Sequence, residues 1–119
     1  MKTYNGIRTP EGAKVTVSTQ NLTSPLRPQA SQRLVNHSPD GFEWGYGGSG
    51  PSQLALAILL DHTGDKEKAL SVYMDFKREV VACMPRNWSL TAAEIDMWLT
   101  RPNEGRYFRA KWDGEDKTE

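Results

Sequence analysis

The sequence predicts an α+β fold, in which a small antiparallel sheet from the N-terminal half packs on about three helices from the C-terminal half. Two observations carry this prediction. Short stretches with strand-like alternation, separated by turn residues, occur before residue 50. After Gly50-Pro51 the apolar residues recur at spacings of three and four, as on a helix. The chain has 119 residues, a length that suits one domain. We therefore expect a single α+β domain at 1–99 and a C-terminal extension at 100–119, either docked or partly flexible.

The N-terminal half predicts strands and loops. The apolar residues Tyr4, Ile7, Val15 and Val17 are spaced as in short strands, and Thr9-Pro10-Glu11-Gly12 between them has turn chemistry. Segments 4–8 and 14–18 therefore predict a β-hairpin. Residues 20–32 contain two prolines and little periodicity, which predicts a surface loop. We expect short strands at 33–36 and 42–46.

The C-terminal half predicts three helices. The first begins at Pro51, is capped by Ser49 or Gly50, and ends at Gly64; its residues are apolar nearly all round, which indicates a buried helix. The second follows Asp65 as N-cap and runs from Lys66 to about Met84, with an inward stripe of Ala69, Leu70, Tyr73, Phe76, Val80 and Met84. The capping box of Thr91 and Glu94 predicts the third helix at 92–99. Its expected inward-facing residues are Ile95, Trp98 and Leu99.

Composition excludes several classes of protein. Fifteen basic residues balance fifteen acidic ones, which argues against a protein that coats nucleic acid by bulk charge. Mean hydropathy is −0.66, and the longest apolar run is Leu54 to Leu60, so we expect neither a membrane span nor a signal peptide. One cysteine, Cys83, rules out an intramolecular disulfide and a Cys-rich zinc site. We expect a cytoplasmic protein without a metal or cofactor.

A glycine-rich segment at 37–51 is the densest motif, because it holds five of the ten glycines. One interpretation is structural: the glycines allow tight turns and close packing. The other is a ligand pocket, in which amides before a helix hold a phosphate or carboxylate and aromatic rings stack on the ligand. The candidate ligand-binding residues are His37, Glu43, Trp44, Tyr46, Gly47, Gly48, Ser49 and Gly50.

Charge distribution limits the pocket interpretation. Residues 37–65 contain four acids and no Lys or Arg, whereas residues 1–36 contain five basic residues and one acid. A bound anion would therefore need Arg8, Lys14, Arg27 or Arg33 as its counter-charge. Gly45, Gly47 and Gly50 match the dinucleotide fingerprint in spacing, but a second helix and not a parallel strand is predicted to follow.

Two other segments suggest alternative chemistry. His37 with Asp40 or Glu43 is a candidate catalytic site of a small hydrolase or transferase, although residues so close in sequence rarely form a catalytic triad. In the C-terminal extension basic and aromatic residues interleave, as on surfaces that bind nucleic acid. The same pattern is expected of a terminal strand or docked extension covering the sheet. The nucleic-acid candidates are Arg106, Tyr107, Arg109, Lys111 and Trp112.

The glycine-rich segment also carries a resemblance. The string from His37 to Pro51, followed by Gln53-Leu54-Ala55-Leu56-Ala57, resembles an uncharacterised domain-of-unknown-function family (the DUF 6166 type) that is frequent in phages and other mobile elements. The resemblance covers about Thr3 to Leu99. It implies a mobile-element setting, in the cytoplasm of a bacterial host, and no particular activity.

These observations predict a non-enzymatic binding protein that sequesters a ligand or blocks a host factor, such as a defence component, through the glycine-rich surface. The expected partner is a host protein or a phosphorylated small ligand, and a homo-oligomer is compatible with the sequence. A nucleic-acid-binding accessory protein is the first alternative. A small hydrolase or transferase using His37 is the second.

Overall fold

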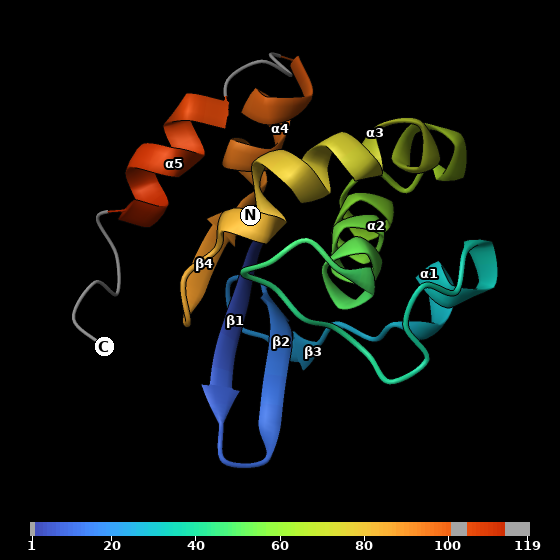
Figure 1. Ribbon diagram of the computed structural model, residues 1–119, viewed down its shortest axis with the longest axis horizontal. Helices are drawn as coiled ribbons and strands as arrows, with labels where there is room; N and C mark the ends of the chain where they lie inside the picture. Colours follow the sequence, from blue (N-terminus) through green and yellow to red (C-terminus); the bar gives the residue numbers. More distant parts are fainter. Residues whose placement is uncertain (1, 101–104, 114–119) are drawn as a thin grey trace. The chain divides into compact units, whose positions relative to one another are not determined.

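The computed structural model describes residues 2–100 and 105–113. It confirms the α+β class, with an antiparallel sheet drawn mainly from the N-terminal half and helices mainly from the C-terminal half (Figure 1). The chain divides into two compact units, Met1–Leu26 with Met84–Glu119, and Arg27–Cys83. Within the described residues, no helix combines the length and the apolar character that crossing a membrane requires.

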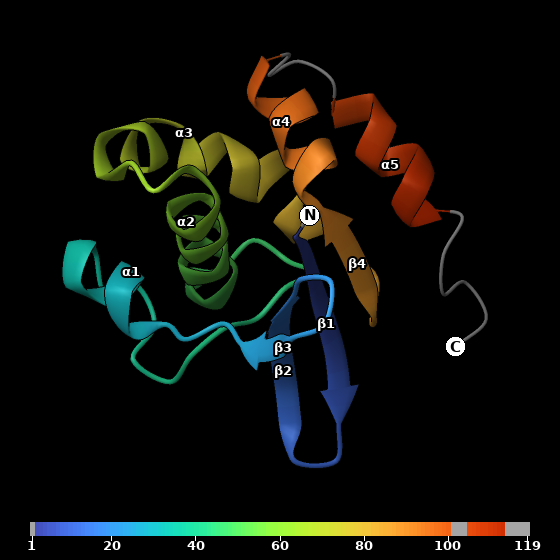
Figure 2. The same cartoon turned by 180° about the vertical axis from the view of Figure 1, so that it is seen from behind.

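The first unit is built on a sheet of four described strands in the order β3-β2-β1-β4, all antiparallel (Figure 2). Strands β1 (Thr3–Thr9) and β2 (Gly12–Ser18) form the predicted hairpin. Strand β3 (Thr23–Pro25) is one edge, and β4 (Trp88–Thr91), which comes late in the sequence, is the other. The sheet therefore needs a strand from the C-terminal half.

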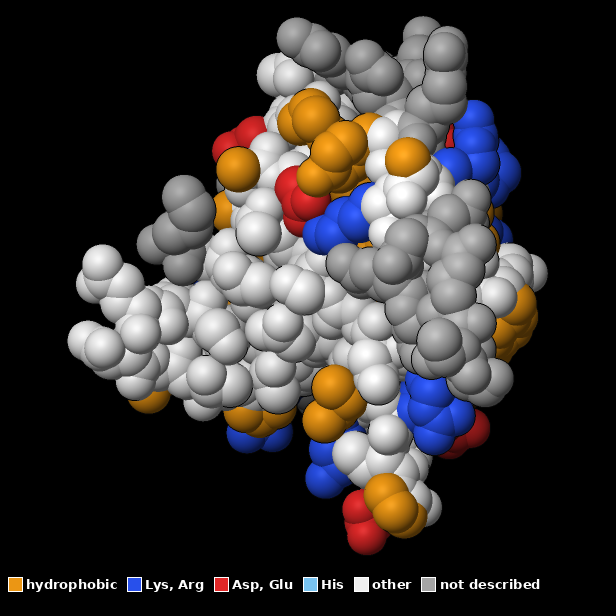
Figure 3. Space-filling view, turned by 90° about the vertical axis from the view of Figure 1, so that its left-hand side faces the viewer, with side chains coloured by type: hydrophobic (Ala, Val, Ile, Leu, Met, Phe, Trp, Pro, Cys, Tyr) orange, Lys and Arg blue, Asp and Glu red, His pale blue; other side chains and the backbone are white. Residues whose placement is uncertain are grey.

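The two faces of this sheet differ in chemistry. Tyr4 pairs with Val17 and Leu90 across the neighbouring strands, and Gly6 pairs with Val15 and Trp88, which makes one face apolar. The alternate positions carry mainly hydroxyl and amide groups, as the period of two along a strand requires. Figure 3 shows the side on which β4 and α5 lie in Figure 1, and white atoms, which are the backbone and side chains other than hydrophobic, charged or histidine ones, cover much of it.

Gly6 is required by its cross-strand neighbour. A Cβ at Gly6 would overlap the indole ring of Trp88, which is buried. The ring thus lies directly on the backbone of β1, where any side chain would displace it. This contact joins β4 to the N-terminal hairpin.

Strand β4 leads directly into α4 (Ala92–Thr100), and the capping box is formed as predicted. The Thr91 N–H donates to Glu94 Oε1 at 3.0 Å, and the Glu94 N–H donates to Thr91 Oγ1 at 3.1 Å. Ile95 and Trp98 are buried as predicted, whereas Leu99 is half-buried. A further helix, α5 (Gly105–Asp113), lies in the C-terminal extension.

The second unit contains α1 (Gln29–Leu34), α2 (Ser49–Thr63), α3 (Lys66–Glu79) and a 3-10 turn, η1 (Val81–Cys83). Helix α2 is buried on every side from Gly50 to Leu59, as its apolar composition predicted. Its end is also as predicted: Gly64 adopts a left-handed conformation, and the Asp65 side chain then accepts from the Lys68 N–H to begin α3.

Several predicted elements were wrong. The segment 20–36 contains β3 and α1 and not a loop followed by a strand, and residues 42–46 lie outside the sheet. The second predicted helix ends at Glu79, short of Met84, and Leu70 points outward. The extension forms a helix and not a terminal strand. On a helix Phe108 and Trp112 share the buried face while Ala110 between them is exposed, whereas on a strand residues 108, 110 and 112 would all share one face.

Candidate functional site

The glycine loop, residues 37–50, joins α1 to α2 and is held at its start by Gln53. This side chain is fully buried in α2. Its Oε1 accepts from the N–H groups of His37 at 2.7 Å and Ser38 at 3.0 Å. Its Nε2 donates to Ser31 Oγ at 2.9 Å and to the Val35 carbonyl at 3.0 Å. The amide oxygen thus accepts two hydrogen bonds and the amide nitrogen donates two. Together they hold the main chain at the start of the loop.

Further hydrogen bonds hold the rest of the loop. Gln32 Nε2 donates to the Ser38 carbonyl at 2.8 Å, and the Gly45 N–H donates to the Val81 carbonyl at 3.0 Å. Gly45 has a φ of 87°, which an L side chain rarely adopts. The second bond attaches the loop to η1, the 3-10 turn that follows α3.

The two aromatic residues of the loop have opposite environments. Trp44 is 1% exposed, so its ring belongs to the core and offers no face to a ligand. Tyr46 is 52% exposed although it is two residues away. The loop therefore presents one aromatic ring to solvent and uses the other as its anchor.

Three glycines near Tyr46 differ in whether their surroundings leave room for a side chain. A Cβ at Gly48 would lie 2.5 Å from Tyr46 Cε2, so Gly48 makes room for the exposed ring. A Cβ at Gly50 would lie 2.7 Å from Glu43 Cβ and 3.1 Å from the Glu43 nitrogen, so Gly50 makes room for the chain itself. At Gly47, which is exposed, a Cβ would meet nothing within 4 Å, and this residue is not among the positive-φ glycines.

The beginning of α2 offers few free N–H donors to an anion. Gly48 is its N-cap, and Pro51 in the first turn has no N–H to donate. The Ser52 N–H and Oγ both donate to the Gly48 carbonyl. An acidic residue, Glu43, packs beside Gly50 in the first turn, where its Cβ, Cγ and main-chain nitrogen would crowd any Cβ.

His37 is paired within the unit, and its partner was not predicted. Its Nε2 lies 2.7 Å from the hydroxyl of Tyr73 on α3, and the two ring centroids are 5.6 Å apart. Burial raises the pKa of Tyr73. Asp40, one of the acids proposed to act with His37, is exposed, and Glu43 is half-buried. Among the described residues, no group of three or more His, Cys, Asp and Glu side chains is placed to hold a metal ion.

The second candidate surface, on α5, has most of its polar groups occupied. Lys111 Nζ donates to both carboxylate oxygens of Glu94, at 2.8 and 2.9 Å, and to the Ser89 carbonyl at 2.7 Å. The Tyr107 hydroxyl donates to Glu94 Oε2 at 2.5 Å. Trp112 is buried, and Arg109 is exposed. The side chain of Arg106 lies outside the described residues.

Glu94 is therefore the centre of this surface. Burial alone would raise its pKa, but the hydrogen bonds from Lys111, Tyr107 and the Thr91 N–H outweigh burial and hold the pKa below its ordinary value. A carboxylate held ionised in this way binds α5 to the end of β4 and the start of α4.

The contacts of Gln53 and Tyr73 with the glycine loop were not predicted from the sequence. Gln53 interrupts an apolar helix, which is a signal for a buried polar network. Tyr73 was predicted as core, and nothing in its spacing indicates a hydrogen bond to a histidine 36 residues away.

Comparison with known families agrees with the resemblance seen in the sequence. The model of a family of unknown function, DUF6166, matches residues 4–101. The chain belongs to this family. The matched region of the DUF6166 member contains the whole glycine loop and nearly all of the described sheet, whereas α5 lies beyond it. No curated protein and no solved structure matches the chain.

Proposed function

We propose that this DUF6166 member is a non-enzymatic binding protein of a phage or mobile element, and that it blocks a host protein through the glycine loop. The binding surface is centred on Tyr46 and Gly47, which are both exposed, and continues to Ser49. The mobile-element setting, the cytoplasm of a bacterial host as the compartment, and a defence component as the target follow from the resemblance and the sequence alone.

The observation that carries this proposal is Gly47. Neither its backbone conformation nor its surroundings within the chain require a glycine. A residue without a side chain leaves its backbone open to close approach by another molecule. Gly47 lies next to Tyr46, so the approaching surface would meet the exposed ring as well.

Tyr46 supports a protein partner. Tyrosine is among the residues that contribute most to protein interfaces, because it buries a large ring with few rotatable bonds. Because Gly48 has no side chain, the Tyr46 ring can lie against the loop backbone, and Gln53 holds the start of the loop. A surface ordered before binding loses less conformational entropy when the partner arrives.

Charge favours a protein over a phosphorylated small ligand. The segment 37–65 carries four acids and no basic residue, and Glu43 takes the space next to Gly50 at the start of α2. A phosphate would meet like charge there, whereas a protein surface with basic residues around an apolar centre would be complementary.

Affinity capture from a bacterial host lysate, compared between variants, tests the proposal. Tyr46→Ala and Gly47→Gln should each reduce the amount of the captured host protein at least tenfold. Leu22→Gln, which removes another exposed apolar side chain, should leave it unchanged. The captured protein is then purified and its binding to each variant measured directly. Equal binding to the wild type and all three variants would overturn the proposal.

A second measurement separates the alternatives. A thermal-shift panel of nucleotides and phosphorylated metabolites should give no shift; a shift that Tyr46→Ala abolishes would replace the protein partner with a phosphorylated ligand. Binding to mixed DNA or RNA that weakens steeply with salt, and that Arg109→Ala reduces, would instead favour the nucleic-acid alternative.

A further inference from the structure

The two edges of the sheet are protected in different ways. An exposed edge strand can pair with another chain, and proteins commonly prevent this with proline, charged residues or a cover. Strand β3 is three residues long and ends at Pro25, which has no N–H. Strand β4, Trp88-Ser89-Leu90-Thr91, contains neither proline nor a charged residue. Its own sequence therefore offers no protection.

Backbone hydrogen bonding shows which groups of β4 face outward. Leu90 pairs with Tyr4, and the Ala92 N–H donates to the Lys2 carbonyl, so Leu90 and Ala92 direct their main-chain groups toward β1. Ser89 and Thr91 alternate with them and direct theirs away from β1. The Ser89 carbonyl and the Thr91 N–H are accordingly met by side chains, those of Lys111 and Glu94.

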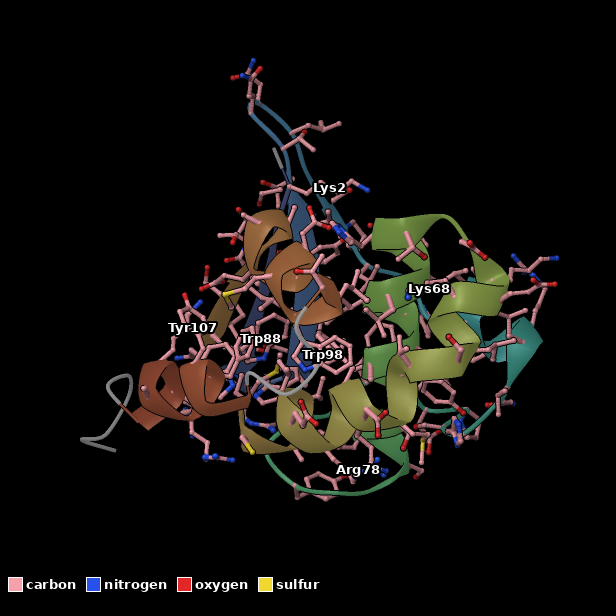
Figure 4. All side chains as sticks on the ribbon, turned by 90° about the horizontal axis from the view of Figure 1, so that it is seen from above. Lys2, Lys68, Arg78, Trp88, Trp98 and Tyr107 are labelled. Carbon is pink, nitrogen blue, oxygen red and sulfur yellow. The ribbon has the colours of Figure 1, made fainter. Side chains whose placement is uncertain are left out.

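Helix α5 is the cover of this edge. Lys111 Nζ reaches the Ser89 carbonyl at 2.7 Å, and the helix is anchored by the buried rings of Phe108 and Trp112. Figure 4 shows α5, with Tyr107 labelled, beside β4 and Trp88. A helix of nine residues is marginal alone, so its docking contacts must hold it. It also lies outside the region matched by the family.

We propose that α5 is a detachable guard of the β4 edge, and that the uncovered edge pairs with β4 of a second copy of this chain. An antiparallel pairing centred on Ser89 lets the Ser89 N–H and carbonyl of each copy bond those of the other. It places Trp88 of one copy opposite Leu90 of the other and brings no two charged residues together. The bond from Thr91 to Glu94 is retained, since the pairing does not need it.

Two full-length variants test whether the guard detaches and whether the uncovered edge then pairs. Lys111→Glu places a second carboxylate against Glu94, and Phe108→Ala removes an anchor. Hydrogen exchange of α5 and of the Ser89 amide, and molar mass by light scattering, are measured for each. The wild type should be monomeric with α5 protected. Both variants should lose protection in α5 and double in molar mass. Arg109→Glu, an equal charge change at an exposed position of α5, should behave as the wild type.

Adding Ser89→Pro to either variant should restore the monomer, because proline removes the N–H that faces the second copy and leaves the bonds to β1 intact. A variant that opens α5 but stays monomeric would overturn the proposal. So would a dimer that persists with Ser89→Pro, a wild type that is already dimeric, or α5 protection that survives both substitutions.

Discussion

The side chain of Gln53 fixes the start of the glycine loop through four hydrogen bonds to Ser31, Val35, His37 and Ser38. The loop itself was predictable as a special segment, because five glycines cluster there. The hydrogen bonds of Gln53 were not predictable, because three of its four partners are main-chain groups, and these leave no pattern of residue types in the sequence. Nor did the sequence indicate that Trp44 is buried while Tyr46 is exposed, since both are aromatic and lie two residues apart.

Replacing Gln53 with leucine should lower the free energy of unfolding by about 3–5 kcal/mol, because it leaves four partly or fully buried donors and acceptors without this partner. Urea unfolding followed by circular dichroism measures this. Gln29→Leu, on the exposed surface of α1, is the matched control and should change stability by less than about 0.5 kcal/mol. Similar values for the two variants would mean that Gln53 does not hold the loop.

Gly6 and Gly47 should respond in opposite ways to the same substitution. Gly6→Ala forces a methyl group into the buried ring of Trp88 and should destabilise by about 1–3 kcal/mol. Gly47→Ala meets nothing within 4 Å and should leave stability unchanged or slightly raised. Thermal unfolding of the two variants side by side provides the measurement. A destabilised Gly47→Ala would show that the chain itself needs this glycine.

At the level of elements, local signals predicted boundaries well. The N-cap Asp65, the left-handed Gly64 and the capping box of Thr91 and Glu94 each act within a few residues, and all are formed. Strands β3 and β4 were missed because their short sequences carry no strand pattern and are held as strands by pairing with their neighbours. The residues of β4 pair with residues of β1 that lie 82 to 88 positions earlier in the chain. The C-terminal extension was predicted as a strand because its basic and aromatic residues interleave over a short span. Such a span does not distinguish the two-residue period of a strand from the three-to-four-residue period of a helix.

Glu94→Gln should weaken the docking of α5 at neutral pH by about 1–2 kcal/mol, because it keeps an acceptor for Thr91 but loses the ion pair with Lys111. The folded-state pKa of Glu94 is lowered. Its contribution to stability is therefore complete above the ordinary Glu pKa of about 4.3 and is lost as the pH falls through the lower folded-state pKa.

The difference in unfolding free energy between wild type and Glu94→Gln should accordingly be constant near neutrality and shrink below about pH 4. Chemical denaturation at a series of pH values measures it. Glu67→Gln, at an exposed position in the first turn of α3, is the control and should show a much smaller difference throughout. A difference that grows on acidification would contradict the assignment of Glu94 as an ionised group that holds α5.

At the scale of the whole molecule, zero net charge combines segments of opposite sign. Residues 1–36 carry five basic residues and one acid, and residues 37–65 carry none and four. Of the basic residues considered as counter-charges, Arg8 and Lys14 belong to the first unit, while Arg27 and Arg33 belong to the second. The α+β class was predictable from the sequence. The division into two compact units was not, because the first unit joins both ends of the chain.

Binding of a host protein by the surface of Tyr46 and Gly47 is tested most directly by isothermal titration of the purified captured partner with wild type, Gly47→Gln and Leu22→Gln. Gly47→Gln should unfold at the wild-type temperature and bind at least tenfold more weakly, while Leu22→Gln binds as the wild type does. Wild-type affinity in Gly47→Gln would contradict the claim, because a side chain at that position would then obstruct nothing.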